Sequence, residues 1–145
     1  MKNDAVEYIG RAEIGRYFPL PLYASKIPAG FPSPAEDYME CQLDLNDRLI
    51  QNSHATFLLK VSGDSMIGAG IMSGGTLVVD RSIEPAHGKV VIAVIDGQLT
   101  VKRLFKKRGV IKLMPENPKY APLLISDEQD LQIWGVVTNV INPLD

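Results

Sequence analysis

The feature that most constrains the fold of this chain is a succession of short apolar segments separated by turn residues. The segments are rich in Val, Ile and Leu, which are typical of strands, and most of them adjoin a Gly, Pro, Asp or Asn. The predicted strands span residues 57–61, 76–80, 89–95, 98–104, 110–114, 122–126 and 131–141. Many short strands at close spacing are typical of antiparallel β architectures. The sequence therefore predicts a mostly β fold, a compact antiparallel β barrel or sandwich.

Three of these segments carry further information about pairing. Asp96-Gly97 is the two-residue signal of a type I′ turn, so residues 89–95 and 98–104 are predicted to form a hairpin. The run W-G-V-V-T-N-V-I near the C-terminus is long and apolar. We interpret it as an unpaired edge strand that a second copy of the chain would cover, with an ordinary central strand as the alternative.

The first 34 residues differ from the rest. Five of the ten prolines fall between Pro19 and Pro34, and proline favours extended backbone. We therefore divide the chain into a proline-rich arm, residues 1–34, and a β-rich domain, residues 35–145. Strict alternation from Tyr38 predicts a half-buried strand, and a short helix is expected at 46–51. The S-P-A-E capping pattern at 33–36 is assigned at most a turn.

Composition limits the classes of function. The chain has 145 residues, 46% hydrophobic and 22% charged, with a net charge of −2. These values fit one globular domain without a field that attracts nucleic acid. The run K-R-L-F-K-K-R at 102–108 is interpreted as a solvated hairpin tip, with a nucleic-acid patch as the minority alternative. No apolar run is long enough to span a membrane, so we expect a soluble, cytoplasmic protein.

No metal or cofactor site is expected. The two histidines, His54 and His87, lie far from each other and from the single cysteine, without the spacing of metal ligands. Both histidines are assigned to surface loops. Cys41 alternates with apolar neighbours and is predicted to be a buried, inert thiol. One cysteine fits a reducing compartment.

The remaining candidates are serines and one lysine. A serine hydroxyl needs a base to become a nucleophile, and a lysine can serve if burial keeps it neutral. V-S-G-D-S-M at 61–66 supplies two serines. Lys102 lies within a predicted strand, on the same face as Thr100 and Leu104. From the residues alone, a turn serine and an exposed strand lysine remain the alternatives.

Three motifs taken together resemble one family. S-G-D-S-M, then T-V-K-R-L, with an Ala-Gly pair upstream, are similar to the LexA/UmuD family of self-cleaving serine proteases, peptidase family S24. L-M-P-E-N-P-K-Y adds to the likeness, which runs from about Ala29 to about Ile141. The resemblance implies a Ser-Lys dyad with Ser65 as nucleophile and Lys102 as general base. It also implies that Ala29-Gly30 is the scissile bond.

The residues around Ser65 receive supporting roles. We expect the backbone N–H groups of Ser65 and of Asp64 or Met66 to stabilise the oxyanion. Gly63 would let the turn bend, and Ser62 is assigned a structural role.

Within the family, the short arm leaves no room for the helix-turn-helix domain of LexA-type repressors, and the chain looks closest to UmuD. That resemblance implies an SOS-response protein that a RecA–single-stranded-DNA filament stimulates to cut itself. The truncated form would serve as a homodimeric regulatory subunit of a UmuC-type Y-family, error-prone translesion DNA polymerase. Neither sequence-specific DNA binding nor membrane association is expected. The alternatives are a LexA-type C-terminal domain, a turnover protease like signal peptidases, and a non-enzymatic partner-binding module.

Overall fold

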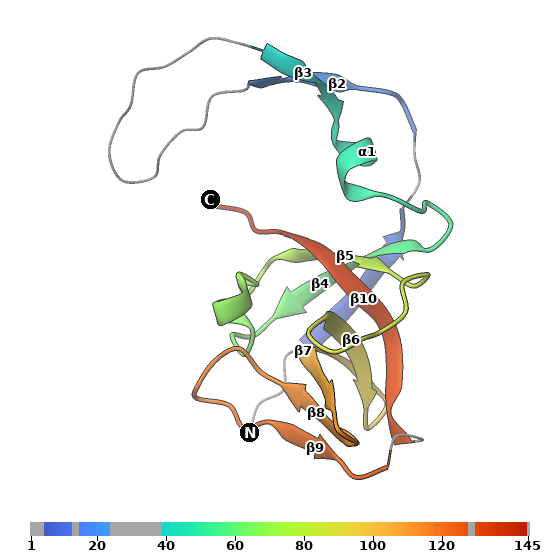
Figure 1. The fold of residues 1–145 in the computed structure, drawn as a ribbon. Helices are drawn as coiled ribbons and strands as arrows, with labels where there is room; N and C mark the ends of the chain where they lie inside the picture. The colour runs from blue at the N-terminus through green and yellow to red at the C-terminus, as the bar shows by residue number, and fades with distance from the viewer. Residues whose placement is uncertain (1–4, 13–14, 24–38, 128–129, 145) are drawn as a thin grey trace.

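The chain forms an eight-stranded antiparallel sheet that curls into a half-barrel (Figure 1). The computed structural model describes residues 5–12, 15–23, 39–127 and 130–144. Along the sheet the strands follow the order β1-β4-β5-β10-β6-β7-β8-β9. In chain order they are β1 (Ala5–Arg11), β4 (Thr56–Ser62), β5 (Thr76–Asp80), β6 (Val90–Ile95), β7 (Gln98–Lys107), β8 (Val110–Met114), β9 (Leu123–Ile125) and β10 (Gln132–Ile141). The predicted mostly β class is confirmed.

The predicted hairpin is present. β6 pairs with β7 in a register that sets Ile95 opposite Gln98. Asp96 and Gly97 have φ angles of 51° and 76°. Both values are positive, as a type I′ turn requires, so this prediction is confirmed.

The run at 102–108 differs from its interpretation as a solvated tip. β7 continues to Lys107, and the turn is formed by Arg108 and Gly109, whose φ angles are 52° and 75°. Lys102 and Leu104 are buried, and only the last residues of the run are exposed. The prediction is wrong for the first half of the run because the core covers that part of β7.

The interpretation of the C-terminal run as an unpaired edge is also wrong. β10 lies between β5 and β6 and pairs with both. Gly135 approaches β5 so closely that an added Cβ would lie 2.6 Å from Val79 Cγ1. The run is apolar because it is a central strand, which was the alternative interpretation of this segment. Among the described strands, the two edges of the sheet are β1 and β9.

The N-terminal region contains strands that the sequence analysis did not assign. β1 pairs with β4, and its Tyr8 packs against the rings of Phe57 and Trp134. A separate two-stranded sheet joins β2 (Pro19–Tyr23) to β3 (Met39–Asp44). The prolines of β2 are tolerated because a strand with one partner leaves its other edge unpaired.

The alternating segment does form a strand, β3, and the predicted short helix follows as α1 (Leu45–Leu49). Asp44 caps this helix by accepting a hydrogen bond from the Asn46 N–H at 2.9 Å. The Cys41 thiol, however, is exposed, so the prediction of a buried thiol is wrong. Among the described strands, β3 pairs only with β2, and alternation there does not mark a face on the main core. The possible turn at 33–36 lies outside the described residues.

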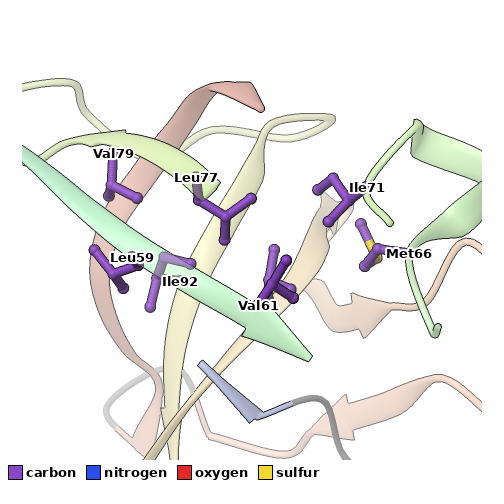
Figure 2. Packing of buried hydrophobic residues seen from close by; sticks show 8 residues of the cluster. Leu59, Val61, Met66, Ile71, Leu77, Val79 and Ile92 are labelled. Atoms are coloured by element: carbon purple, nitrogen blue, oxygen red, sulfur yellow. The ribbon is translucent and has the colours of Figure 1, made fainter. Parts of the chain in front are cut away.

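The core consists of two clusters, which contain alternate residues of β6 and therefore lie on its opposite faces. Figure 2 shows the larger one, in which side chains from β4, β5 and β6 meet Met66 and Ile71 from the connection between β4 and β5. Its buried members are Leu59, Val61, Met66, Ile71, Leu77, Val79, Ile92 and Val101. The second cluster lies between β6, β7, β8 and β10. Its buried members are Val91, Ala93, Leu104, Ile111, Leu113 and Val136.

Two expectations about the surface can be compared with the fold. His54 and His87 are exposed, as predicted. His87 also accepts a hydrogen bond from the Lys106 N–H at 3.0 Å. No helix in the described part of the chain is both long and apolar enough to cross a membrane.

Candidate active site

The structure brings one serine and one lysine together inside the protein. Lys102 Nζ lies 2.9 Å from Ser65 Oγ. Ser65 is fully buried and Lys102 is only 7% exposed. A hydroxyl and an amine at hydrogen-bond distance, shielded from water, form the arrangement in which a proton can pass from serine to lysine.

Lys102 is held from β7 by neighbours in its own strand. Its Nζ lies 3.2 Å from Thr100 Oγ1 and 3.1 Å from the Val101 carbonyl oxygen. Thr100 and Val101 are both buried, so β7 is covered on both faces at this point. The alternation of apolar and polar residues therefore breaks down in β7, and it could not show which face of the strand is buried.

These contacts fit two protonation states of Lys102. An ammonium donates three hydrogen bonds, one each to Ser65, Thr100 and Val101. A neutral amine donates two, to Thr100 and Val101, and its lone pair accepts the Ser65 hydroxyl proton. Because a hydroxyl rotates freely to suit its partner, the same positions of the heavy atoms serve both states.

The turn that carries Ser65 is fixed at both ends. Gly63 has a φ of 104°, which an L side chain rarely adopts, and its N–H donates to Ser73 Oγ at 3.1 Å. Ser62 Oγ donates to the Ala5 carbonyl oxygen at 3.3 Å. On the far side, the Met66 side chain is 1% exposed within the core. Met66 thus anchors the turn, a role that the sequence analysis did not assign to it.

A second segment braces the same turn. The Glu116 N–H donates to the Ser65 carbonyl oxygen at 2.7 Å, and the Gly68 N–H donates to the Glu116 carbonyl oxygen at 2.8 Å. Asn117 Nδ2 donates to the Asp64 carbonyl oxygen at 2.9 Å, and the Tyr120 hydroxyl donates to Asp64 Oδ1. Sequence reasoning missed these contacts because it used L-M-P-E-N-P-K-Y only as a mark of the family.

Two backbone donors remain available beside the serine. Within the described part of the chain, the N–H groups of Asp64 and Met66 donate no hydrogen bond. Met66 precedes the single turn of 3₁₀ helix η1 (Ile67–Ala69), which starts directly after it. Donors of this kind next to a nucleophile can stabilise a developing oxyanion.

A cavity of about 170 Å³ opens beside Lys102. Its wall is mostly apolar, with Ile95, Leu113, Ala121 and Leu123, and Asp96 and Tyr120 add polar groups beside Lys102. The predicted scissile residues, Ala29 and Gly30, lie outside the described residues. Among the described residues, His, Cys, Asp and Glu form no group of three or more that could hold a metal ion.

Comparison with known proteins assigns the chain to a family. Residues 21–138 match the family described as Peptidase S24-like. SamA from Salmonella typhimurium is 50% identical over 122 residues, which cover 84% of each chain. ImpA from Escherichia coli is 47% identical over 84% of this chain and 83% of its own. MucA from Escherichia coli is 41% identical over 96% of this chain and 93% of its own. The chain therefore belongs to the peptidase S24-like family, the LexA/UmuD family of self-cleaving serine peptidases.

Proposed function

We propose that this protein cuts its own chain between Ala29 and Gly30, with Ser65 as nucleophile and Lys102 as general base. The observation that carries the proposal is the 2.9 Å approach of Lys102 Nζ to Ser65 Oγ at a buried site. Membership of a self-cleaving family supports it. In this account residues 1–34 are an arm that supplies the substrate, and residues 35–145 form the domain that cuts it.

The base must be neutral to accept a proton. Burial disfavours the charged ammonium, which acts to lower the pKa of Lys102 from the ~10.4 of an exposed lysine. The neutral amine keeps its two donor contacts to Thr100 and Val101, which aim its lone pair at Ser65. The hydrogen bonds that surround Lys102 thus orient the base as well as hold it.

The reaction then proceeds in two stages. Lys102 takes the Ser65 hydroxyl proton while Ser65 Oγ attacks the Ala29 carbonyl carbon. Backbone N–H groups of Ser65 and of Asp64 or Met66 stabilise the oxyanion. The Lys102 ammonium protonates the Gly30 nitrogen as the peptide bond breaks. Water, with Lys102 again as base, hydrolyses the ester between Ser65 and Ala29.

The biological role follows from likeness to SamA, ImpA and MucA over most of each chain. We assign the chain a UmuD-like role in SOS mutagenesis, in the cytoplasm. A RecA–single-stranded-DNA filament would stimulate the cut. The shortened chain, as a homodimer, would then regulate a UmuC-type Y-family translesion polymerase.

Mass spectrometry of the purified protein after incubation at alkaline pH tests the proposed cut. The expected products are residues 1–29 and 30–145, because alkaline pH increases the neutral fraction of Lys102. Ser65→Ala should remain intact while it stays folded. Ser126→Ala is the matched control, since it removes an exposed hydroxyl just after β9, and it should be cut as the parent is. Cutting at another bond, or by Ser65→Ala at the parent rate, would contradict the proposal.

A further inference from the structure

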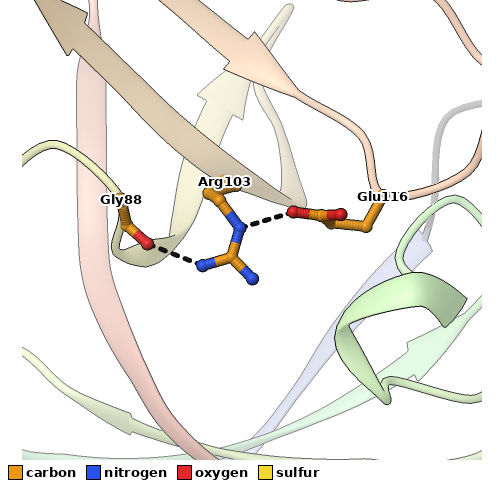
Figure 3. A network of polar contacts seen from close by, with 3 residues as sticks. All are labelled: Gly88, Arg103 and Glu116. Carbon is orange, nitrogen blue, oxygen red and sulfur yellow. Dashed lines mark hydrogen bonds and ion pairs between the residues drawn. The ribbon is translucent and has the colours of Figure 1, made fainter.

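An ion pair on the other side of β7 connects the strand of Lys102 to the turn of Ser65. Arg103 follows Lys102 in β7, and its Nε lies 2.5 Å from Glu116 Oε1 (Figure 3). Its Nη1 donates to the Gly88 carbonyl oxygen at 2.6 Å. The guanidinium therefore links the segment before β6 to the segment after β8.

Glu116 passes this link on to the nucleophile through its backbone. Its N–H holds the Ser65 carbonyl oxygen, and its carbonyl oxygen accepts from the Gly68 N–H, as described above. The contact with Gly68 is so close that an added Cβ would lie 2.6 Å from the Glu116 oxygen. Glu116 thus contacts β7 through its side chain and both ends of the 65–68 segment through its backbone.

We propose that Arg103 and Glu116 are positioning residues that set the distance between Ser65 and Lys102. The inference rests on the proposed function and adds to it. β7 carries Lys102, the base, on one side, and on the other side it carries Arg103, which contacts Glu116. Neither Arg103 nor Glu116 contacts the Ser65 hydroxyl among the described contacts.

The chemistry of the pair suits this role better than a role in overall stability. The two side chains are 36% and 34% exposed, and ion pairs with such access to water contribute little to folding. Arginine can donate from two nitrogens in fixed directions, to Glu116 and to Gly88, which a lysine cannot do. Loss of the pair should therefore disturb alignment rather than unfold the protein.

The test compares first-order rates of self-cutting for Arg103→Gln, Glu116→Gln and the double variant across alkaline pH. A displacement of about 1 Å in a reacting group can cost roughly a hundredfold in rate, so we expect each single variant to cut about ten to a hundred times more slowly. The double variant should be no slower than the slower single one, because both break the same link. Lys107→Gln, which removes an exposed charge from the same strand, is the matched control and should cut at the parent rate.

The pH dependence separates positioning from a direct effect of charge on Lys102. Positioning lowers the rate at every pH and leaves the midpoint of the pH profile unchanged. A purely electrostatic role would move the midpoint up in Arg103→Gln and down in Glu116→Gln, and that result would overturn the inference. Thermal unfolding of each variant shows that it is folded at the assay temperature. If Arg103→Gln is not folded there, the nearly isosteric Glu116→Gln decides alone.

The outcomes distinguish this inference from the proposed function. If the parent cuts, Ser65→Ala does not, and both single variants stay within twofold of the parent, the positioning role is overturned and the proposed function stands. If the parent itself does not cut, the proposed function is overturned, and the positioning role falls with it.

Discussion

At the scale of single residues, the site depends on the burial of one lysine. The alternation of side chains along a strand placed Lys102 on the same face of β7 as Thr100 and Leu104. It did not show whether that face is buried. The answer depends on strands far away in the sequence, since the turn of Ser65 closes over Lys102 from 37 residues upstream. The serine and the lysine were thus predictable as a pair only through resemblance to a family. The distance between the two side chains could be obtained only from the folded structure.

The same burial predicts how self-cutting depends on pH. Only neutral Lys102 can act as base, so the rate should rise with pH through the pKa of Lys102 and level off above it. Since burial lowers that pKa, the midpoint should lie below ~10.4. Thr100 Oγ1, at 3.2 Å from Nζ, stabilises the ammonium more than the amine. Thr100→Val should therefore move the midpoint to lower pH.

Rates of cutting across a pH series would check this prediction. Thr138→Val is the control, because its hydroxyl donates to the Val78 carbonyl oxygen, which lies outside the site. Its midpoint should match that of the parent. An unchanged or higher midpoint in Thr100→Val would show that Thr100 does not stabilise the charged form of Lys102.

At the scale of elements, local signals located the strands from β3 onward and the short helix but missed β1 and β2, and they did not give the strand order. Strand positions and the Asp96-Gly97 turn follow from nearby residues, and the structure has them. The place of β10 in the sheet does not follow from its own sequence, because an apolar run suits a central strand and a protected edge equally. Cys41 was misplaced for a similar reason, since alternation shows two faces but not what covers them.

The hairpin that carries Lys102 gives a prediction at this scale. Gly97 has a φ of 76°, where an added Cβ costs about 1 kcal/mol or more. Gly97→Ala should lower the free energy of unfolding by about this amount in urea titrations. Gly10→Ala is the control, because a Cβ there meets nothing within 4 Å and its φ is unstrained. Equal effects of the two substitutions would contradict the assignment of the strain to the turn.

At the scale of the whole molecule, the proposed cut should change which strand forms one edge of the sheet, because it separates β1 from the rest of the chain. β1 forms one edge through its pairing with β4, yet it lies on the N-terminal side of the proposed scissile bond. After the cut only non-covalent contacts hold β1, and the high effective concentration of a tethered strand is lost. We expect residues 1–29 to dissociate at micromolar concentration and to leave β4 as the new edge.

Trp134, the single tryptophan, can report this change. The Tyr8 ring of β1 lies 6.3 Å from the Trp134 ring, centroid to centroid, so loss of β1 exposes the indole to water. Its fluorescence emission should shift to longer wavelength as the cut proceeds, and excess synthetic peptide of residues 1–29 should reverse the shift. Ser65→Ala, incubated in parallel, should show no shift. Complete cutting with unchanged emission would show that β1 stays in place.

The central claim is that Ser65 and Lys102 together perform the cut. The most direct measurement is the intact mass over time at alkaline pH for the parent, Ser65→Ala and Lys102→Ala, each shown to be folded by circular dichroism. The account predicts that the parent alone yields residues 1–29 and 30–145. A folded Lys102→Ala protein that cuts at the parent rate would contradict it.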